Sequence, residues 1–281
     1  MTTLRLVLLA GVTTALVGCS LPPFPVPGSG AAGTAGSGAA AAVPYSSETY
    51  TRMLQEYVNE RGLVDYEGLQ RRPEDLERYV AVIGAVPPER YRSWSEAKQI
   101  AFLLNAYNAL TLASIIQETP LKASIKDIWG VWNLRRHQVA GQPRTLDAIE
   151  HQILRKDFNE PRIHAALVCA ANSCPPLRRE PYAAERLEQQ LEDQVRRWLE
   201  GPHGLRIDRT GERVLISPIF RWFGEDWGRA NPTAAPVPGH VKDSAVLAFI
   251  GDYVRPEDRA YLAQGRYALG TLDYDWSLNR Q

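Results

Sequence analysis

The sequence predicts an α+β domain: a helical N-terminal half with a central buried helix that packs on a small, mostly antiparallel sheet. Apolar residues at helical spacing fill residues 47–118. Two later segments, residues 136–146 and 204–217, alternate apolar and polar residues around a glycine, as β-hairpins do. Helical patterns also lie between and after these hairpins. This order is typical of α+β folds and argues against a doubly wound parallel sheet.

The first residues of the 281-residue chain have the pattern of a bacterial lipoprotein signal. Arg5 supplies positive charge, and the apolar run at residues 6–17 is shorter than the roughly 20 residues of a membrane-spanning helix, which indicates a secretory signal. The run ends in Leu-Val-Gly-Cys, which resembles the lipobox, where cleavage occurs just before an acylated cysteine. We therefore expect residues 1–18 to be a signal peptide and Cys19 to carry the lipid anchor, palmitate included.

The segment that begins at Cys19 predicts a tether at the membrane. Residues 19–46 are rich in proline, glycine and alanine and hold too few large apolar side chains to fold alone. Ser20 stands where an aspartate would favour the inner membrane of enteric bacteria, so we expect an outer-membrane location facing the periplasm. Residues 47–281 then form a single globular domain. The formal net charge of +0 argues against a nucleic-acid partner, which leaves the membrane and an unknown envelope ligand or protein.

Three helices are predicted in the N-terminal half of the domain. Residues 47–61 and 73–83 have helical patterns, and residues 62–69 between them suggest a short extended piece. The third helix, residues 95–118, begins at a serine suited to an N-cap and is apolar nearly all round from residue 100 to 116. We expect this third helix to be the buried centre of the fold.

Hairpins and helices alternate after the central helix. Gly141 stands at the turn of the hairpin 136–146, and Thr145 then caps a helix over residues 146–154. Residues 163–169 are a short apolar run that predicts a fully buried strand.

The C-terminal part continues the alternation. Residues 182–200 predict an amphipathic helix, and a Thr-Gly pair marks the turn of the second hairpin at 204–217. Short helices are expected at residues 243–253 and 257–262.

With Cys19 taken up by the expected lipid anchor, Cys169 and Cys174 are the two thiols that remain. In an oxidising compartment they would form a disulfide if the chain turns between them. Either could also be a plain core residue. As a third alternative, Cys174 is a candidate nucleophile, because Arg178 and Arg179 nearby would lower the pKa of its thiol. The sequence leaves these alternatives open.

His164 and His151 are the candidate general bases for such a thiol. Glu150 precedes His151 on the predicted helix, and neighbours on a helix do not face each other. We therefore expect Glu150 to line the same pocket rather than to orient the imidazole directly.

A metal site is not expected. His164, Cys169 and Cys174 match no recognised zinc spacing, and a straight strand would point His164 and Cys169 to opposite faces. The sequence predicts no cofactor either.

The central helix carries Asn105, Tyr107 and Asn108. The two asparagines are three residues apart and share a face. Because a buried, unpaired amide is costly, each must bond either to facing backbone or to a ligand. Asn105, Tyr107 and Asn108 are therefore candidate binding or structural residues.

Several of these motifs together resemble one family, the domain of unknown function 547. They occur in that family's order: LVDYEGL, QIAFLLNAYNALTLASII, GQPRTLDAIEHQIL, PRIHAALVCAANSCPPLRREPY, ISPIFRWFGEDWG and LDYDWSLN. The resemblance implies a fold similar to papain-like or transglutaminase-like thiol enzymes, which place a nucleophile at the start of a central helix. The long helix here has no cysteine. A nucleophile would then have to be Cys174, or the protein is not an enzyme.

The sequence is compatible with two functions. The first is a non-catalytic envelope module that binds a peptide, a glycan or a partner protein. The second is a thiol-dependent hydrolase or transferase in which Cys174 is the nucleophile, His164 or His151 the base, and Asn105, Asn108 or Glu150 the orienting group. We favour the binding module because the sequence shows no complete triad.

Overall fold

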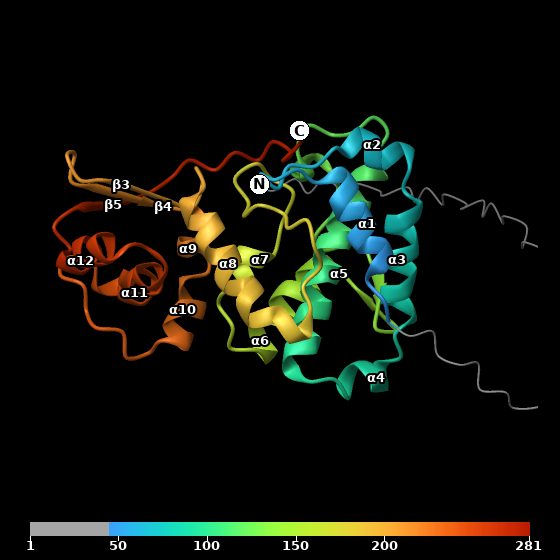
Figure 1. Ribbon diagram of the computed structural model, residues 1–281, viewed down its shortest axis with the longest axis horizontal. Coiled ribbons are helices and arrows are strands. Elements are labelled where there is room, and N and C mark those ends of the chain that lie inside the picture. Colours follow the sequence, from blue (N-terminus) through green and yellow to red (C-terminus); the bar gives the residue numbers. More distant parts are fainter. Residues whose placement is uncertain (1–44) are drawn as a thin grey trace, which may run out of the picture. The chain divides into compact units, whose positions relative to one another are not determined.

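The computed structural model describes residues 45–281 (Figure 1). The predicted signal peptide, the lipidated Cys19 and nearly all of the predicted tether lie outside the described residues and stay predictions. The α+β class is confirmed, since helices dominate and the described residues form one two-stranded and one three-stranded sheet. Tyr45 already packs on the domain, with its hydroxyl 2.7 Å from that of Tyr79.

Four helices precede the central helix: α1 (Glu48–Tyr57), α2 (Tyr66–Arg71), α3 (Glu74–Ala85) and α4 (Pro88–Arg92). Of these, α1 and α3 were predicted, and α2 and α4 were not. The helix predicted over residues 47–61 ends earlier, at Tyr57. The extended piece predicted over residues 62–69 was wrong in its second half, because Asp65 accepts the Gly68 N–H at 2.8 Å and so caps α2. Side-chain capping decided the local structure here.

The central helix is confirmed as α5 (Glu96–Ile116). Ser95 caps it by accepting the Lys98 N–H. In the described part of the chain, α5 is the one helix long and apolar enough to cross a membrane, but 83% of its most apolar window is buried inside the protein. It is therefore a core helix, with α2 and α3 on one side and the segment around residues 148–186 on another.

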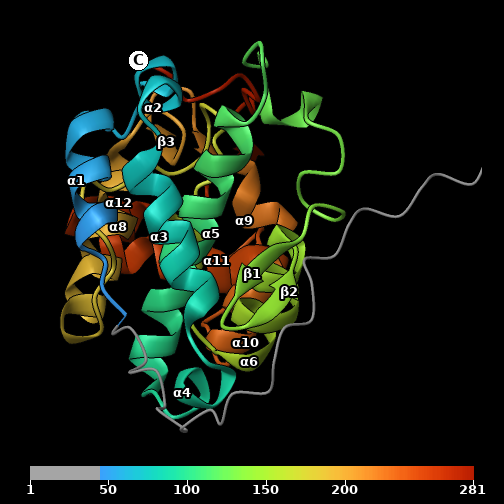
Figure 2. The same ribbon diagram turned by 90° about the vertical axis from the view of Figure 1, so that its right-hand side faces the viewer.

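The first hairpin, β1 (His137–Val139) and β2 (Gln142–Arg144), is confirmed, with Gly141 at a φ of 68° in the turn. Figure 2 shows it beside α3, where its turn bonds to the carbonyls of Ile83 and Gly84. The predicted Thr145 cap is also confirmed, since its hydroxyl accepts the Ala148 N–H at 3.1 Å.

The capped segment is a π-helix, η2 (Ala148–Leu154), which continues as α6 (Arg155–Asp157). Single π turns of this kind are found frequently at functional sites.

The strand predicted over residues 163–169 was wrong. Residues 163–166 form one helical turn, α7 (Ile163–Ala166), in which the Leu167 N–H bonds to the Ile163 carbonyl at 2.9 Å. A run that is buried on all sides has no polar face to show its period, so the pattern alone does not separate a short helix from a strand. The predicted helix at 182–200 begins later, as η3 (Ala184–Arg186) and α8 (Leu187–Glu200).

The second sheet has the predicted hairpin β3 (Leu205–Asp208) and β4 (Arg213–Ile216), with β5 (Ala268–Thr271) added parallel to β4. Nothing in the sequence pattern indicated β5. The predicted C-terminal helices are α11 (Ser244–Tyr253) and α12 (Pro256–Gln264), and the aromatic segment before them forms α9 (Pro218–Trp222) and α10 (Gly224–Ala230). Short turns η1 (Ile125–Asp127) and η4 (Val241–Asp243) complete the elements.

The buried side chains form two hydrophobic clusters. The first surrounds α5 and includes Val139 of the two-stranded sheet. The second contains β4, with Val214 and Ile216, together with α8, α10 and α11. The three-stranded sheet is therefore not the surface on which α5 packs, in contrast to the expected arrangement. Figure 1 shows β3, β4 and β5 beside α11 and α12, at the opposite end of the domain from α1 and α3.

Both cysteines lie in a stretch with little regular structure, residues 167–183, here called the cysteine loop. Two asparagines of α5 hold its ends. Asn108 donates to the Ala166 carbonyl at 3.0 Å and accepts the Val168 N–H at 2.9 Å. Asn105 donates to the Tyr182 carbonyl and accepts the Tyr182 N–H, both at 2.8 Å. Each amide thus replaces the two hydrogen bonds that a neighbouring strand would supply.

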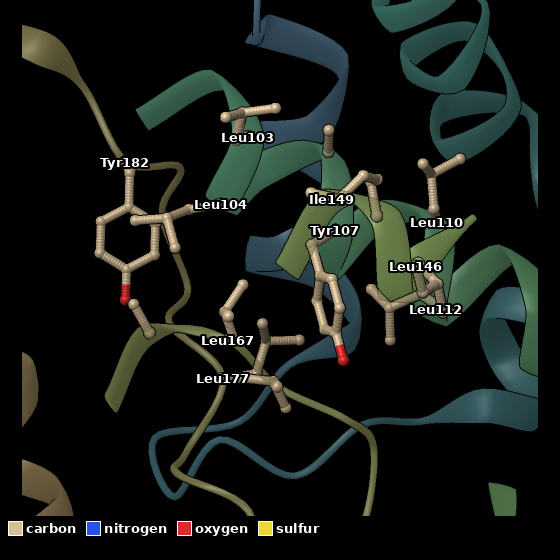
Figure 3. Close-up of a cluster of buried hydrophobic side chains, with 14 of the residues drawn as sticks. Leu103, Leu104, Tyr107, Leu110, Leu112, Leu146, Ile149, Leu167, Leu177 and Tyr182 are labelled. Atoms are coloured by element: carbon tan, nitrogen blue, oxygen red, sulfur yellow. The ribbon is translucent and has the colours of Figure 1, made fainter. Parts of the chain in front are cut away.

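Two glutamines of α8 hold the same loop from the other side. Gln194 donates to the carbonyls of Ala165 and Pro176, at 2.9 and 2.7 Å. Gln190 donates to the Pro181 carbonyl and accepts the Ala183 N–H, at 2.9 and 2.8 Å. Both side chains are at most 2% exposed. Figure 3 shows Leu167 and Leu177 of the loop within the cluster around Tyr107 of α5.

The C-terminal segment pairs with the middle of the cysteine loop. The Asn172 N–H bonds to the Ser277 carbonyl at 2.7 Å, and the Asn279 N–H bonds to the Ala170 carbonyl at 3.0 Å. The Ser173 hydroxyl accepts the Asp275 N–H at 2.8 Å. This pairing brings two aromatic residues of the C-terminal segment next to the cysteines.

We expect Asn108→Ala to destabilise the domain by about 2–4 kcal/mol, because it leaves the Ala166 carbonyl and the Val168 N–H buried without partners. Urea unfolding, compared through the transition midpoint at constant slope, measures the change. Asn159→Ala, at an exposed amide, is the matched control and should change stability by less than about 0.5 kcal/mol. Equal effects of the two substitutions would contradict the structural role of Asn108.

Candidate functional site

A cavity of about 230 Å³ lies between the cysteine loop, η2, α9 and the C-terminal segment. Its volume is below the roughly 300–1,000 Å³ of pockets for drug-sized ligands, so it suits a single ring or the end of a chain. The aromatic side chains on its walls are Tyr107, Trp132, Trp222, Phe223, Tyr274 and Trp276.

The cavity brings together most of the residues that the sequence marked as candidates. Glu150, His151 and His164 line it, and so do both cysteines. It also includes Tyr107 of the asparagine helix.

Cys169 and Cys174 are joined by a disulfide, with their Cα atoms 6.2 Å apart. Of the alternatives that the sequence left open, the structure has the bridged one. The Cys169 N–H points at Cys174 Sγ at 3.1 Å, and the Tyr274 hydroxyl lies 3.3 Å from the same sulfur. In this oxidised form Cys174 has no thiol to act as a nucleophile.

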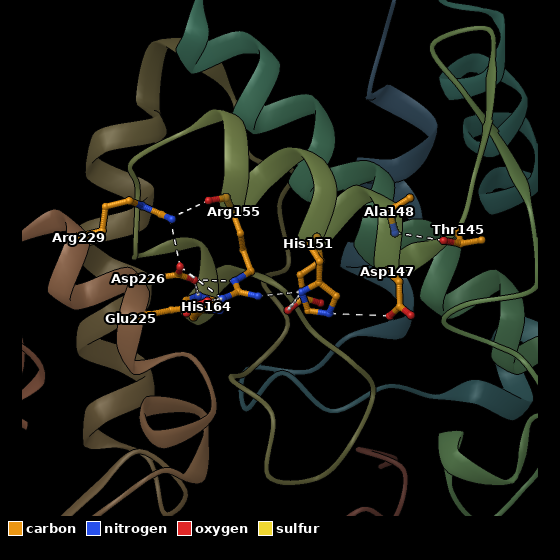
Figure 4. Close-up of polar contacts among 10 residues, drawn as sticks. Thr145, Asp147, Ala148, His151, Arg155, His164, Glu225, Asp226 and Arg229 are labelled. Carbon is orange, nitrogen blue, oxygen red and sulfur yellow. Dashed lines mark hydrogen bonds and ion pairs between the residues drawn. The ribbon is translucent and has the colours of Figure 1, made fainter.

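His164 is 3% exposed and forms part of a buried ion-pair network (Figure 4). Its Nε2 lies 2.7 Å from Asp226 Oδ2, and its ring stacks on Phe223 at 4.4 Å between centroids. In residues 45–281 the hydrogen-bond partners of Cys174 Sγ are the Cys169 N–H and the Tyr274 hydroxyl, so no histidine bonds to this sulfur. The predicted nucleophile–base pair is not assembled.

Asp226 is the centre of that network. Arg155 Nε donates to its Oδ2 at 2.6 Å, and Arg229 Nη2 donates to its Oδ1 at 3.1 Å. Burial opposes ionisation, but the hydrogen bonds from His164 and Arg155 outweigh it and lower the pKa of Asp226 to about 2. The carboxylate therefore stays charged and fixes His164 on α7 against α10.

His151 is exposed at the rim of the cavity. Arg155 Nη1 lies 3.2 Å from its Nδ1, and because an arginine can only donate, Nδ1 accepts and the proton sits on Nε2. That Nε2 is 3.9 Å from Asp147. Glu150 lies 4.0 Å from the Nδ1, too far for a hydrogen bond, which agrees with the expectation that Glu150 does not orient this imidazole.

Glu150 acts instead on the two tyrosines of the cavity. Burial and the Glu150 carboxylate both raise the pKa of Tyr107 well above its ordinary value. Burial, and to a lesser degree Glu150, also raises the pKa of Tyr274. Both phenols therefore keep their protons at neutral pH.

Asn105 and Asn108 do not line the cavity, because their amides are taken up by the backbone of the cysteine loop. Asp226, Arg155 and Tyr274 were missed by the sequence analysis. Their motifs were visible as FRWFGEDWG, AIEHQILRKD and LDYDWSLN, but their pairs with other parts of the site join residues 62 to 105 positions apart. A single sequence holds no signal for such pairings.

No group of three or more histidine, cysteine, aspartate or glutamate side chains within residues 45–281 is placed to hold a metal ion. The helical turn at α7 also removes the strand geometry on which the sequence argument against zinc relied.

Stability should fall as the pH drops from about 4 to about 2, because the folded protein holds Asp226 at a pKa of about 2 against an ordinary 3.8. The unfolded chain binds the proton first, so this contribution is complete above about pH 4 and is lost as the pH falls through the folded pKa. Asp226→Asn should cost about 2 kcal/mol at pH 7 and flatten the profile between pH 4 and 2. Urea unfolding across pH checks this.

The exposed Asp273 is the control for that experiment. Asp273→Asn should keep the wild-type profile. A profile for Asp226→Asn that still parallels the wild type below pH 4 would show that Asp226 does not carry the effect.

Comparison with known proteins identifies one family and no individual relative. No curated protein and no solved structure matches the chain. The likeness to papain-like or transglutaminase-like enzymes therefore stays a prediction. The family described as "Protein of unknown function, DUF547" matches residues 91–199, which include α5, η2, the cysteine loop and all of α8 except its last residue. The predicted resemblance is thus confirmed: over residues 91–199 this chain resembles the DUF547 family.

Proposed function

We propose that this protein is a lipid-anchored module of the bacterial cell envelope that binds a glycan in the aromatic cavity. The observation that carries the proposal is the set of aromatic side chains that line a small cavity together with two carboxylates, those of Asp147 and Glu150. Sugar rings have an apolar C–H face and a polar edge of hydroxyls. A site for them needs flat aromatic surfaces and hydrogen-bonding groups next to each other.

Three of the aromatic rings on the cavity wall contact one another. The ring of Trp222 lies 5.8 Å from that of Trp276 at an angle of 18°, and Tyr274 lies 4.6 Å from Trp276. Trp222 is 48% exposed although it is among the largest apolar side chains. Contiguous apolar surface marks interaction sites, and the exposed ring of Trp222 adjoins those of Tyr274 and Trp276. The electron-rich ring faces attract the weakly positive C–H groups of a sugar.

The polar rim supplies partners for hydroxyl groups. Asp147 and Glu150 offer carboxylate oxygens, and His151 offers the Nε2 proton. Aromatic walls alone would suit many apolar ligands. The two carboxylates next to them favour a ligand rich in donors, such as a sugar.

Binding is favoured over the alternative of a thiol-dependent hydrolase or transferase. That reaction needs a free thiol on Cys174 and a base in contact with it. Cys174 is in a disulfide, and His164 is bound to Asp226. The polar groups of the cavity therefore do not include a free nucleophile with a base in contact with it.

The envelope location rests on the sequence of the N-terminal segment. The lipobox pattern supports acylation of Cys19, and the residues up to 46 supply a tether for the domain at 47–281. Ser20 supports sorting to the outer membrane, with the domain facing the periplasm. A domain held near the surface in this way would meet envelope glycans at high local concentration.

Cys19→Ser in the full chain should abolish labelling by a clickable palmitate analogue and move the protein from the membrane to the soluble fraction, because the acylated residue is lost. Ser20→Thr, which keeps the cysteine, is the control and should stay lipidated. Palmitate labelling that survives Cys19→Ser would contradict the anchor.

Trp222→Ala should weaken binding of a glycan about tenfold, since it removes one stacking face. Chitohexaose, a chain of N-acetylglucosamine, is the probe, and intrinsic tryptophan fluorescence is the readout. Trp222→Phe should bind with intermediate affinity because it keeps a smaller ring. Val241→Ala, at an exposed apolar residue away from the cavity, should bind as the wild type does.

Binding of chitohexaose that is equal in wild type and Trp222→Ala would contradict the proposed site. Binding of unrelated peptides, but not of glycans, at Trp222 would contradict the ligand class.

A further inference from the structure

The disulfide lies where the hydrophobic cluster around α5 meets the aromatic cavity. Both cysteines line this cavity. Cys169 is half-buried, whereas Cys174 is 8% exposed. Of the two cysteines, Cys169 is therefore the more accessible to a small solute that enters the cavity.

The cysteine loop does not depend on the disulfide for its position. Asn108 and Gln194 hold the backbone on either side of the bridge, and Asn172 and Ser173 pair with the C-terminal segment. The bridge joins residues only five positions apart, and closing so short a loop removes little entropy from the unfolded chain. A purely structural role leaves the position of the bridge on the cavity wall unexplained.

The polar groups around the two sulfurs are unequal. Cys174 Sγ faces the Cys169 N–H at 3.1 Å and the Tyr274 hydroxyl at 3.3 Å, while Cys169 Sγ faces the Tyr274 hydroxyl alone, at 3.4 Å. Hydrogen-bond donors stabilise a thiolate more than a thiol. Negative charge is therefore better accommodated on Cys174 than on Cys169.

We propose that this disulfide undergoes exchange with low-molecular-weight thiols that enter the aromatic cavity, forming a mixed disulfide on Cys169. The thiolate of the small molecule attacks Cys169 Sγ, and a new S–S bond forms there. The Cys169–Cys174 bond breaks, and its electron pair leaves on Cys174 Sγ as a thiolate held by the Cys169 N–H and the Tyr274 O–H.

The reverse step restores the bridge without any other oxidant. The Cys174 thiolate attacks Cys169 Sγ and expels the small thiol. Because the loop is fixed at both ends, the two sulfurs stay close and this return is intramolecular. This proposal does not rest on the glycan proposed above, although both ligands would enter the same cavity.

Reduced glutathione is the probe for the test. The full-length protein, solubilised in detergent, is incubated with it in the absence of denaturant, then treated with iodoacetamide and analysed by peptide mass spectrometry. We expect glutathione on Cys169 and the alkyl group on Cys174. The rate of adduct formation should rise in proportion to the glutathione concentration. It should not reach a limit set by the rate at which the protein unfolds.

Tyr274→Phe tests the assigned stabilisation of the leaving thiolate. It keeps the ring and removes the donor, so the exchange rate should fall about tenfold, the effect of losing one hydrogen bond to a developing charge. Tyr261→Phe is the matched control, because the Tyr261 hydroxyl bonds to nothing in the described part of the chain. Its rate should equal that of the wild type.

Three results would each overturn the proposal. One is a bridge that reacts only under conditions that unfold the protein. Another is glutathione found on Cys174 as readily as on Cys169. The third is a Tyr274→Phe variant that exchanges as fast as the wild type.

Discussion

Paired hydrogen bonds between buried side-chain amides and the cysteine loop are the constraint on which the rest of this structure depends. A loop that runs through the interior must find a partner for each backbone N–H and carbonyl, and for this reason loops usually stay at the surface. Here Asn105 and Asn108 on α5, and Gln190 and Gln194 on α8, supply these partners. They allow a segment with little regular structure to lie between two helices.

The fixed loop in turn builds the cavity. Its middle part pairs with the C-terminal segment, which places Tyr274 over the disulfide and Trp276 on the cavity wall. At the start of the loop, α7 presents His164 to Asp226 on α10, and this contact ties the cluster around α5 to the cluster around the three-stranded sheet. A change in the loop would therefore affect the bridge, the aromatic wall and the join between the clusters together.

The sequence predicted those features whose cause is local. Ser95 and Thr145 cap their helices as expected, and the first hairpin turns at Gly141. The need of Asn105 and Asn108 for partners also followed from burial alone, although not which partners. Features that depend on residues far apart in the sequence were missed or predicted wrongly. The helical turn of α7 was predicted as a strand, and β5 was not predicted. The contact between His164 and Asp226 joins residues 62 positions apart and was also missed.

Amide hydrogen exchange at Val168 and Tyr182 tests the central claim most directly. Each N–H donates to a buried asparagine side chain in the absence of regular secondary structure. If the amide pairs fix the loop, both should exchange as slowly as the core amides of α5, because they would open only when the domain unfolds. Exchange at the rate of exposed loop amides, while α5 stays protected, would contradict the account.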